Sequence, residues 1–454
     1  MAHDENSMYI PHSSSCGFIF FIRDFEWNFF MPQRIAHTIK HFSRTTFSSL
    51  AIRNYRLYVI GQGISVCGTW MQTIGQSWLV LELTNSGTAL GLVIACQFLP
   101  ILILGPWGGV VADRVSKRKL LFITQTSSGL LALILGALVA TNTVQLWMVY
   151  VLAIMLGLVN AFDNPTRQSF IFEMVGGEQL GNAITLNSTE VNLGRIIGPA
   201  IAGIIIASIG LALCFFINAV SYVAMLVCLF LMRGDELSPI EPIKRAKGQL
   251  REGFSYVNHT PLLRDLLIMM AIVGTFTFEF QVSLALVAKY TFQGNATDYA
   301  LLTSGMGVGA VLGGLATAGR RKTSIRGLVW MAIAFGIAIC IAASSPTLAF
   351  AALAMVIVGV CSICFTTIGN TILQLESAPQ MRSRVMSLWS VAFLGSTPIG
   401  GPVIGWIGEH INPRFGLGMG GIAAIAAGIF GMIAMKKHIS DQFSESVVQA
   451  SSLK

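Results

Sequence analysis

The sequence predicts an all-α integral membrane protein with twelve transmembrane helices in two pseudo-symmetric six-helix bundles. The composition is the first reason: 54% of the residues are hydrophobic and 11% are charged, whereas soluble domains are about 25% charged. The second reason is a series of apolar runs of about 20 residues, enough to cross a hydrocarbon core ~30 Å thick. The third is an internal repeat, in which Gly198-Pro199 recurs as Gly401-Pro402.

The predicted spans are apolar runs separated by charged or turn-forming residues. In chain order they are residues 58–81, 88–112, 119–140, 146–166, 182–209, 212–232, 264–289, 297–318, 325–344, 346–370, 385–408 and 415–435. Prolines inside several of these runs do not exclude them, because membrane helices tolerate kinks whose freed carbonyls find other partners.

Lysine and arginine residues lie almost entirely on one side of these spans. The three exceptions among the 29 are Lys289 and Arg414, on the opposite side, and Arg195, inside a span. Cytoplasmic loops carry an excess of Lys and Arg. The crowded side is therefore predicted to be the cytoplasm, and an even number of spans places both termini there.

The spans divide the chain into five predicted parts. These are a cytoplasmic N-terminal segment at 1–57, a bundle at 58–232, a cytoplasmic linker at 233–263, a second bundle at 264–435 and a cytoplasmic tail at 436–454. The first thirty residues are aromatic but interrupted by charges, so we expect disorder rather than a span. The linker contains an amphipathic pattern that fits either a helix under anionic headgroups or a solvated helix. Its apolar face would carry Ile243, Leu250, Phe254 and Val257.

A short charged segment joins the second and third spans. It reads Gly109-Val-Val-Ala-Asp113-Arg114-Val-Ser-Lys117-Arg118-Lys119. A positive-inside anchor would account for the cations, but not for Asp113 or for the glycine four residues before it. The order Gly-x-x-x-Asp-Arg-x-small-Lys-Arg resembles the signature loop between helices 2 and 3 of the major facilitator superfamily, with Ser116 where that pattern usually has glycine.

The fifth span carries small residues every four positions, at Gly194, Gly198 and Ala202. Such a face allows close helix packing, and packing alone could explain it. The longer pattern, which adds Pro199 and Gly203, resembles the fifth-helix motif of superfamily antiporters, most of which are exporters.

Further short matches resemble the branch of the superfamily that contains the bacterial enterobactin exporter and transmembrane secretion effectors. They are Asn54-Tyr-Arg56, Trp70-Met71-Gln72, Asp163-Asn-Pro165, Arg167-Gln168, Asn182-Ala183 and Leu186-Asn187-Ser188. The resemblance covers about residues 50–435. It implies a bacterial inner-membrane location and a charge cluster of Asp113, Lys117 and Asp163. That cluster would belong to a conformational latch formed by Gly109, Asp113, Arg114, Lys117, Arg118 and Asp163.

Ionisable residues inside the spans are the candidates for a proton and substrate pathway, because a charge in lipid is costly unless it is paired or wetted. Arg195 is predicted near mid-membrane. Glu190, five residues earlier, lies on another face of the same helix. Superfamily antiporters usually carry an arginine on helix 4, but residues 149–162 contain none. Arg195 is therefore expected to take over that role, with Asn187 as a polar neighbour on the pathway.

Glu279 is the strongest candidate in the second half. It lies near the middle of the seventh span, in a predicted polar stripe with Thr275 and Ser283. The internal repeat that aligns Gly198 with Gly401 also aligns Gln76 of the first span with Glu279. A carboxyl group in a low-dielectric environment favours its neutral form and could exchange a proton near neutral pH. The alternative is a neutral, hydrogen-bonded structural acid.

Together these features predict a secondary active transporter, with proton-coupled efflux of small amphipathic molecules of siderophore-like or drug-like character. The sequence contains no Gly-x4-Gly-Lys-Ser/Thr loop, which argues against ATP-driven transport, and no catalytic cluster suggests an enzyme. Expected partners are the cargo, protons and the lipid bilayer, with no nucleic acid, cofactor or metal, and the chain is expected to be monomeric. The alternatives are uptake or facilitated diffusion of a polar solute, and a membrane scaffold or sensor that transports nothing.

Overall fold

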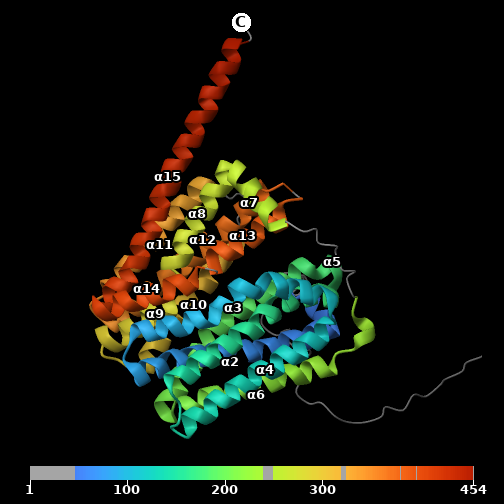
Figure 1. The fold of residues 1–454 in the computed structure, drawn as a ribbon, viewed down its shortest axis with the longest axis vertical. Helices are drawn as coiled ribbons and strands as arrows, with labels where there is room; N and C mark the ends of the chain where they lie inside the picture. The colour runs from blue at the N-terminus through green and yellow to red at the C-terminus, as the bar shows by residue number, and fades with distance from the viewer. Residues whose placement is uncertain (1–46, 239–248, 319–323, 379, 395, 453–454) are drawn as a thin grey trace, which may run out of the picture. The chain divides into compact units, whose positions relative to one another are not determined.

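The computed structural model describes residues 47–238, 249–318, 324–378, 380–394 and 396–452. Within these ranges the chain is helical and contains no β-strand. Ser49–Lys454 form one compact unit, in which helices α2 to α15 are arranged as Figure 1 shows. The predictions for the first thirty residues and for the basic segment at 319–322 lie outside the described residues.

The N-terminal half of this unit consists of five long helices. They are α2 (Arg53–Thr84), α3 (Gly87–Arg114), α4 (Lys117–Ala140), α5 (Leu146–Ser208) and α6 (Leu211–Leu231). A single-turn η4 (Gly234–Glu236) and the linker helix α7 (Gln249–His259) follow.

The C-terminal half is built from shorter pieces. They are α8 (Pro261–Phe276), α9 (Phe280–Leu286), the π-helical turn η5 (Val287–Thr291), α10 (Ala296–Ala318), α11 (Ile325–Ala343), α12 (Leu348–Glu376), α13 (Arg382–Leu394), α14 (Thr397–His410) and α15 (Pro413–Ser452).

Among the described residues, ten helical segments are long and apolar enough to cross a membrane. One of them, α5, has 63 residues and breaks at Gly176, whose φ of 67° is accessible mainly to glycine. It therefore supplies two of the predicted spans. The polar residues of α2 exclude it from the ten, although its 32 residues exceed the needed length. The architecture is thus consistent with the predicted twelve spans.

The predicted end of the fourth span at residue 166 is wrong. Helix α5 continues through Pro165 and breaks only at Gly176. Proline removes one backbone hydrogen bond, which a membrane helix tolerates when neighbouring groups compensate. Asp163 therefore lies inside a helix, about 20 Å from its break, and not at a helix end as predicted.

The seventh span was predicted as one helix, but it is discontinuous. Helix α8 ends at Phe276 and α9 begins at Phe280. Two side chains hold the intervening residues away from helical geometry: the Thr277 hydroxyl donates to the Gly420 carbonyl (2.8 Å), and the Phe278 ring lies 4.6 Å from the Phe393 ring.

The described part of the eleventh span contains α13 and α14, and residue 395 between them lies outside the described residues. Helix α14 begins at Thr397-Pro398, with proline in its first turn, where the missing N–H costs no intrahelical hydrogen bond. The break of the seventh span lies beside the end of α13, because the rings of Phe278 and Phe393 are in contact.

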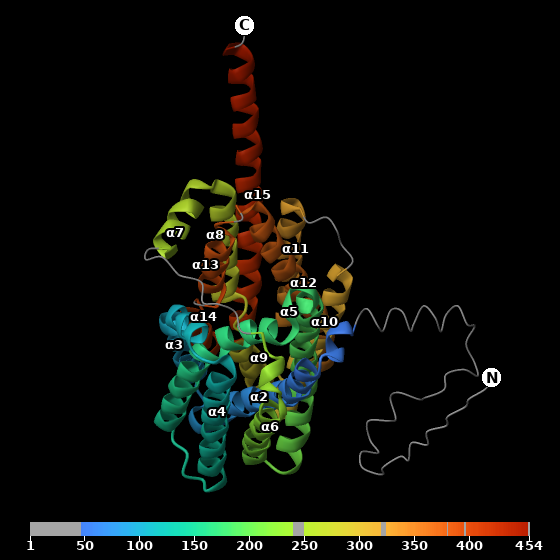
Figure 2. The same cartoon turned by 90° about the vertical axis from the view of Figure 1, so that its right-hand side faces the viewer.

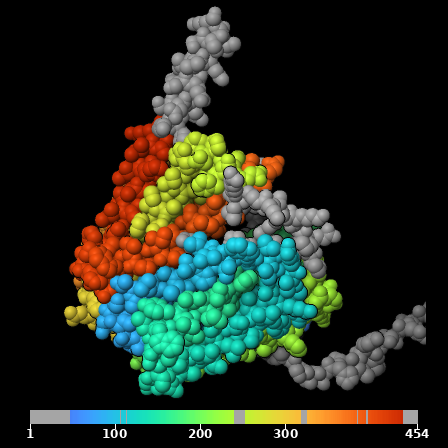
Figure 3. All heavy atoms as spheres, viewed as in Figure 1, coloured from blue at the N-terminus to red at the C-terminus, as the bar shows by residue number. Residues whose placement is uncertain are grey.

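The two halves meet along two pairs of helices. Helix α3 packs against α14, and α5 packs against α10; Figure 1 shows the first pair and Figure 2 the second. Figure 3 shows the blue α3 surface directly against the orange α14 surface. The internal repeat places α5 onto α14, so the two contacts correspond to each other.

The predicted amphipathic linker helix forms as α7. Val257 is buried, while Phe254 is 67% exposed. Glu252 pairs with Arg384 of α13 at 2.5 Å, so α7 is anchored to the C-terminal half (Figure 2). Ile243 and the side chain of Leu250 lie outside the described part of the chain.

Candidate functional site: a cavity between the two halves

A cavity of about 720 Å³ lies between the N-terminal and C-terminal halves. This volume is within the usual range for small-molecule sites. Much of its wall is aromatic, and one face of α12 is polar. The aromatic residues are Trp70, Phe98, Phe278, Phe280, Tyr299, Trp389 and Phe393, and the polar residues of α12 are Ser362, Thr366, Thr367, Asn370 and Thr371.

The structure brings Arg195 and Glu279 to this one cavity, from opposite halves. No ion pair joins them. Gln76 lines a small neighbouring cavity, and Gln281 borders both cavities. Asn187 and Glu190 line neither of these two cavities, so the predicted pathway residues are only partly assembled there.

Glu279 lies at the break between α8 and α9, and its side chain is buried, with 3% exposure. Its carboxylate faces the beginning of α14, close to Gly400. A Cβ atom at Gly400 would lie 2.9 Å from Glu279 Oε1 and would also meet the Thr275 carbonyl. Glycine at position 400 therefore allows α14 to approach both the carboxylate and α8.

The predicted polar stripe along the seventh span does not form, because the helix is interrupted. The Thr275 hydroxyl donates to the Ala271 carbonyl (2.6 Å), and the Ser283 hydroxyl donates to the main-chain carbonyl of Glu279 (3.1 Å). Neither hydroxyl contacts the Glu279 carboxylate, and Oε1 of that carboxylate has no hydrogen-bond partner.

Arg195 projects from α5 toward α2. Its guanidinium carbon lies 5.0 Å from the centre of the Trp70 ring, within the range of a cation–π contact. Its Nε is buried and has no hydrogen-bond partner. Among the described residues, no carboxylate lies within ion-pair distance of this guanidinium.

The glycines of the fifth-helix motif provide the close packing that their spacing predicts. A Cβ at Gly194 would collide with Val66, and one at Gly198 would lie 2.5 Å from the Trp70 Cβ. Both contacts bring α5 onto α2. Gly203 faces α10, where a Cβ would lie 3.0 Å from the Ala300 Cβ. Pro199 is buried in the same helix. The motif thus positions the helix that carries Arg195 against both halves.

The charged hairpin is as short as predicted, with α3 ending at Arg114 and α4 beginning at Lys117. Lys117 Nζ lies 2.6 Å from Glu173 Oε1, and both side chains are buried. Arg118 instead donates to the carbonyls of Leu229 and Phe230 at the end of α6. The side chain of Asp113 lies outside the described residues. The expected cluster of Lys117 with Asp163 is replaced by the Lys117–Glu173 pair.

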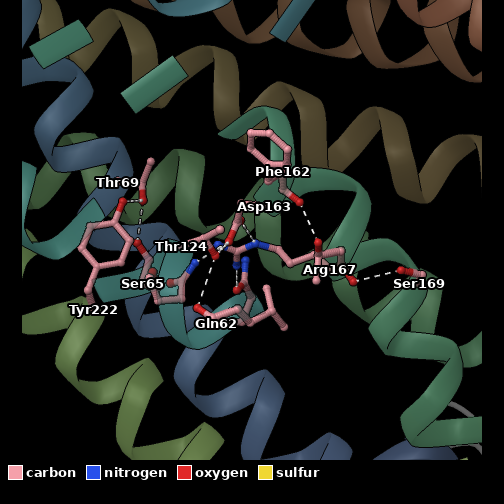
Figure 4. A network of polar contacts seen from close by, with 12 residues as sticks. Gln62, Ser65, Thr69, Thr124, Phe162, Asp163, Arg167, Ser169 and Tyr222 are labelled. Carbon is pink, nitrogen blue, oxygen red and sulfur yellow. Dashed lines mark hydrogen bonds and ion pairs between the residues drawn. The ribbon is translucent and has the colours of Figure 1, made fainter. Parts of the chain in front are cut away.

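Asp163 forms its own buried network, drawn in Figure 4. Its Oδ1 accepts hydrogen bonds from Thr124 Oγ1 (2.6 Å) and Gln125 Nε2 (2.8 Å). Its Oδ2 pairs with Arg167 Nε at 2.5 Å. Arg167 also donates to Gln62 of α2. This network joins α2, α4 and α5 within the N-terminal half.

Arg167 is the site residue that sequence reasoning missed. The fourth helix was expected to lack an arginine because its end was predicted too early, whereas α5 carries Arg167 one turn after Asp163. The i, i+4 spacing of an acid and an arginine was the available signal. Arg167 also acts electrostatically on Glu190, whose two carboxylate oxygens are buried without hydrogen-bond partners.

Hydrogen bonds and close backbone contacts hold the two halves together at one end, here called the clasp end. Glu409 Oε2 accepts from Ser86 Oγ (2.7 Å), from Thr88 Oγ1 (2.7 Å) and from the Thr88 backbone N–H (2.9 Å). Lys289 Nζ donates to the Leu81 carbonyl (2.6 Å) and to Asn85 Oδ1 (2.8 Å). The hairpin between α3 and α4 lies at the opposite end of α3.

Replacing Gly91 by leucine is expected to prevent closure of the clasp end. A Cβ at Gly91 would collide with the Gly401 carbonyl of α14, so the halves should separate there. On a cysteine-free background with a single cysteine at cavity residue Thr303, labelling by an impermeant maleimide from the clasp side should rise several-fold. Gly105→Leu, on the same helix but with open space around its Cβ, is the matched control. Unchanged labelling in Gly91→Leu would mean that this contact does not close the cavity.

The comparisons with known proteins identify the family. The model of a family described as transmembrane secretion effector matches residues 44–452. The chain belongs to this family. It is therefore a multi-pass membrane protein of a transporter family within the major facilitator superfamily, and the predicted membership and all-helical fold are confirmed.

Several relatives are similar over different parts of the chain. The staphyloferrin A transporter of Staphylococcus aureus is 35% identical over 36% of this chain, a region that is 41% of that protein. The multidrug efflux pump Tap of Mycolicibacterium fortuitum is 25% identical over 76% of this chain and 87% of its own length. The enterobactin exporter EntS of Shigella flexneri is 23% identical over 84% of this chain and 91% of its own length.

Solved structures share the fold at low sequence identity. A bacterial homologue of the lysosomal transporter Spinster, in an inward-facing and occupied conformation, superposes with a TM-score of 0.67 at 16% identity, covering 86% of this chain and 98% of that one. The nucleoside transporter NupG gives a TM-score of 0.67 at 14% identity, and the superposition covers 84% of this chain and 99% of the NupG chain. These similarities establish the architecture.

Proposed function

We propose that this protein is a proton-coupled secondary transporter that exports small amphipathic molecules across the bacterial inner membrane. The observation that carries the proposal is the 720 Å³ cavity between the two halves, bordered by the break between α8 and α9. In transporters built from repeats, interrupted helices of this kind form the substrate site near mid-membrane. The mixed aromatic and polar wall of the cavity suits an amphipathic cargo.

The named functions of the relatives support export and the class of cargo. A multidrug efflux pump and an enterobactin exporter each resemble most of this chain, and a staphyloferrin A transporter resembles part of it. Siderophore-like and drug-like molecules are therefore the first candidates. The buried acid Glu279 at the cavity wall supports proton coupling, because a carboxyl group in such a setting can alternate between neutral and charged forms.

The contacts at the clasp end support a rocking mechanism. The halves are joined there by Glu409 and Lys289, and the positive-inside distribution of cations supports an extracytoplasmic location for that end. The state described is then inward-facing, with the cavity closed to the outside. Export requires the second state, in which the clasp end separates and the hairpin end closes.

We also propose that the α3–α4 hairpin stabilises one of these two states. Its residues Gly109, Asp113, Arg114, Lys117 and Arg118 lie where the halves should meet when the cytoplasmic end closes. Asp163 contributes indirectly in this proposal, because it fixes α4 and α5 through Thr124 and Arg167. The Lys117–Glu173 pair then holds the hairpin on its own half in the inward-facing state.

Uptake into inverted membrane vesicles tests the proposed transport. With a proton gradient that is acidic inside, vesicles containing the protein should accumulate a catecholate siderophore, a hydroxycarboxylate siderophore or the dye ethidium above the level of protein-free vesicles. A protonophore should collapse that accumulation. Equal signals with and without the protein for all three probes would reject the proposal.

Labelling of introduced cysteines tests the orientation. Ser116, in the hairpin, and Ser238, after η4, are exposed and should face the cytoplasm. On a cysteine-free background, cysteines there should resist an impermeant maleimide in intact cells and react after permeabilisation. A cysteine at Thr143, exposed between α4 and α5, is the control and should react from outside. The reverse pattern would invert the topology.

A further inference from the structure

We infer that the cavity binds an anionic group of its cargo at Arg195, so that the transported class is amphipathic anions with an aromatic or aliphatic body. This inference rests on the proposed transport function and specifies its substrate class. It depends on the surroundings of Arg195, on the Trp70 ring beneath it and on the polar face of α12 across the cavity.

The charge of Arg195 has no protein counter-ion. A guanidinium remains protonated in a protein, and a cation inside a membrane span costs several kcal/mol unless it is compensated. Two other cations of the N-terminal half are compensated: Lys117 pairs with Glu173 and Arg167 pairs with Asp163. Within the described ranges, Arg195 has no such partner, and its Nε lacks any acceptor. An anion entering from the cavity would supply the missing counter-charge.

The Trp70 ring positions the guanidinium for this role. The Arg195 guanidinium carbon lies 5.0 Å from the ring centre, and both side chains line the cavity. Stacking on an aromatic face leaves the N–H groups at the edge of a guanidinium free for hydrogen bonds. A carboxylate can accept two of these in parallel, which adds directional selectivity to the charge attraction. The cavity therefore favours a planar oxyanion over a compact halide-like ion.

The remaining walls define the rest of the ligand. Thr366, Thr367 and Asn370 face the cavity from α12. The Thr366 hydroxyl already donates to the Ser362 carbonyl (3.0 Å), so its oxygen can accept a further hydrogen bond from a ligand hydroxyl or amide. Trp389 and Phe393 stack with ring centres 5.5 Å apart and offer a flat apolar surface. Together these groups fit a hydroxylated aromatic acid better than a cationic drug.

Binding of a matched acid and amide to the purified protein tests this inference. The probes are 1-hydroxy-2-naphthoate and 1-hydroxy-2-naphthamide, which share the same body and hydroxyl but differ in charge. We expect the wild-type protein to bind the acid about tenfold more tightly than the amide, as measured by calorimetry. Arg195→Gln should bind both probes equally, and Arg195→Lys should keep part of the preference. Arg414→Gln removes a cation that does not line the cavity and should behave as wild type.

The outcomes separate this inference from the proposed function. Equal binding of acid and amide, or no binding of the acid, overturns the anion site. Retention of the full preference in Arg195→Gln overturns the role of Arg195. If Arg195→Gln does not fold, the preference of the wild-type protein for the acid and the result for Arg195→Lys still decide whether an anion binds at this position. Protein-dependent, gradient-driven uptake of ethidium or the amide without uptake of the acid would leave export intact and reject the anionic substrate class.

Discussion

Replacing Glu279 by glutamine is expected to abolish gradient-driven accumulation of cargo while leaving cargo binding and exchange intact. Glutamine keeps the shape and the polarity of the side chain, but it cannot ionise. A proton carrier must be neutral in one state of the cycle and charged in the other. The variant should therefore still interconvert between its two states, but a proton gradient should not drive accumulation of cargo.

The surroundings of Glu279 explain why a small local rearrangement could change its protonation. Its carboxylate faces α14, where a Cβ at Gly400 would lie 2.9 Å from Oε1, and Glu279 is the residue directly before α9. Helix α9 belongs to an interrupted span, and α14 is the helix that meets α3 of the other half. Movement of the halves thus changes the packing and hydration of this carboxylate directly, and a carboxyl group responds strongly to both.

The size of the effect follows from the driving force. A gradient of one pH unit supplies about 1.4 kcal/mol, so a one-for-one exchanger can accumulate cargo up to about tenfold. Vesicles with Glu279→Gln should show no accumulation, while counterflow of preloaded cargo should stay within about twofold of wild type. Glu178→Gln, which alters an exposed acid on α5, should accumulate normally. Continued uphill transport by Glu279→Gln would make Glu279 a structural acid and leave Glu190 as the next candidate.

The fold was predictable because it depends on apolar length and on repetition, both of which are visible in the sequence. Most of α3, α4 and α6 lies within a few residues of prediction for that reason. The break in the seventh span was not predictable, since it depends on tertiary contacts of Thr277 and Phe278 with residues more than a hundred positions away.

The candidate site was predictable only in part, and the errors have physical causes. An ionisable residue in an apolar run is conspicuous, so Arg195 and Glu279 were identified. The buried ion pairs were not identified, because a pair such as Lys117 and Glu173 joins residues 56 positions apart. Arg167 was missed for a different reason, since the asparagine and proline before it resemble a helix end although α5 continues through them.

Removing one member of the Lys117–Glu173 pair is expected to destabilise the protein strongly. Both side chains are buried, with 6% and 9% exposure, and their charged atoms lie 2.6 Å apart. Breaking such a pair leaves an uncompensated buried charge, which costs about 3–5 kcal/mol, whereas replacing both charges by apolar groups is often neutral. Lys117→Met and Glu173→Leu should each lower the yield and melting temperature of the purified protein, and the double variant should recover both.

The exposed pair Arg233–Glu236 provides the control for this cycle. Its side chains are 59% and 37% exposed, so removal of either should change stability by less than about 1 kcal/mol. Single variants of Lys117 and Glu173 that melt like wild type would show that the pair is hydrated.

The folded double variant also separates a structural role of the pair from a role in transport. If the pair must open before the hairpin can engage the C-terminal half, an apolar replacement should restore folding but alter the transport rate. If the double variant transports at the wild-type rate, opening of the Lys117–Glu173 pair is not a step of the latch.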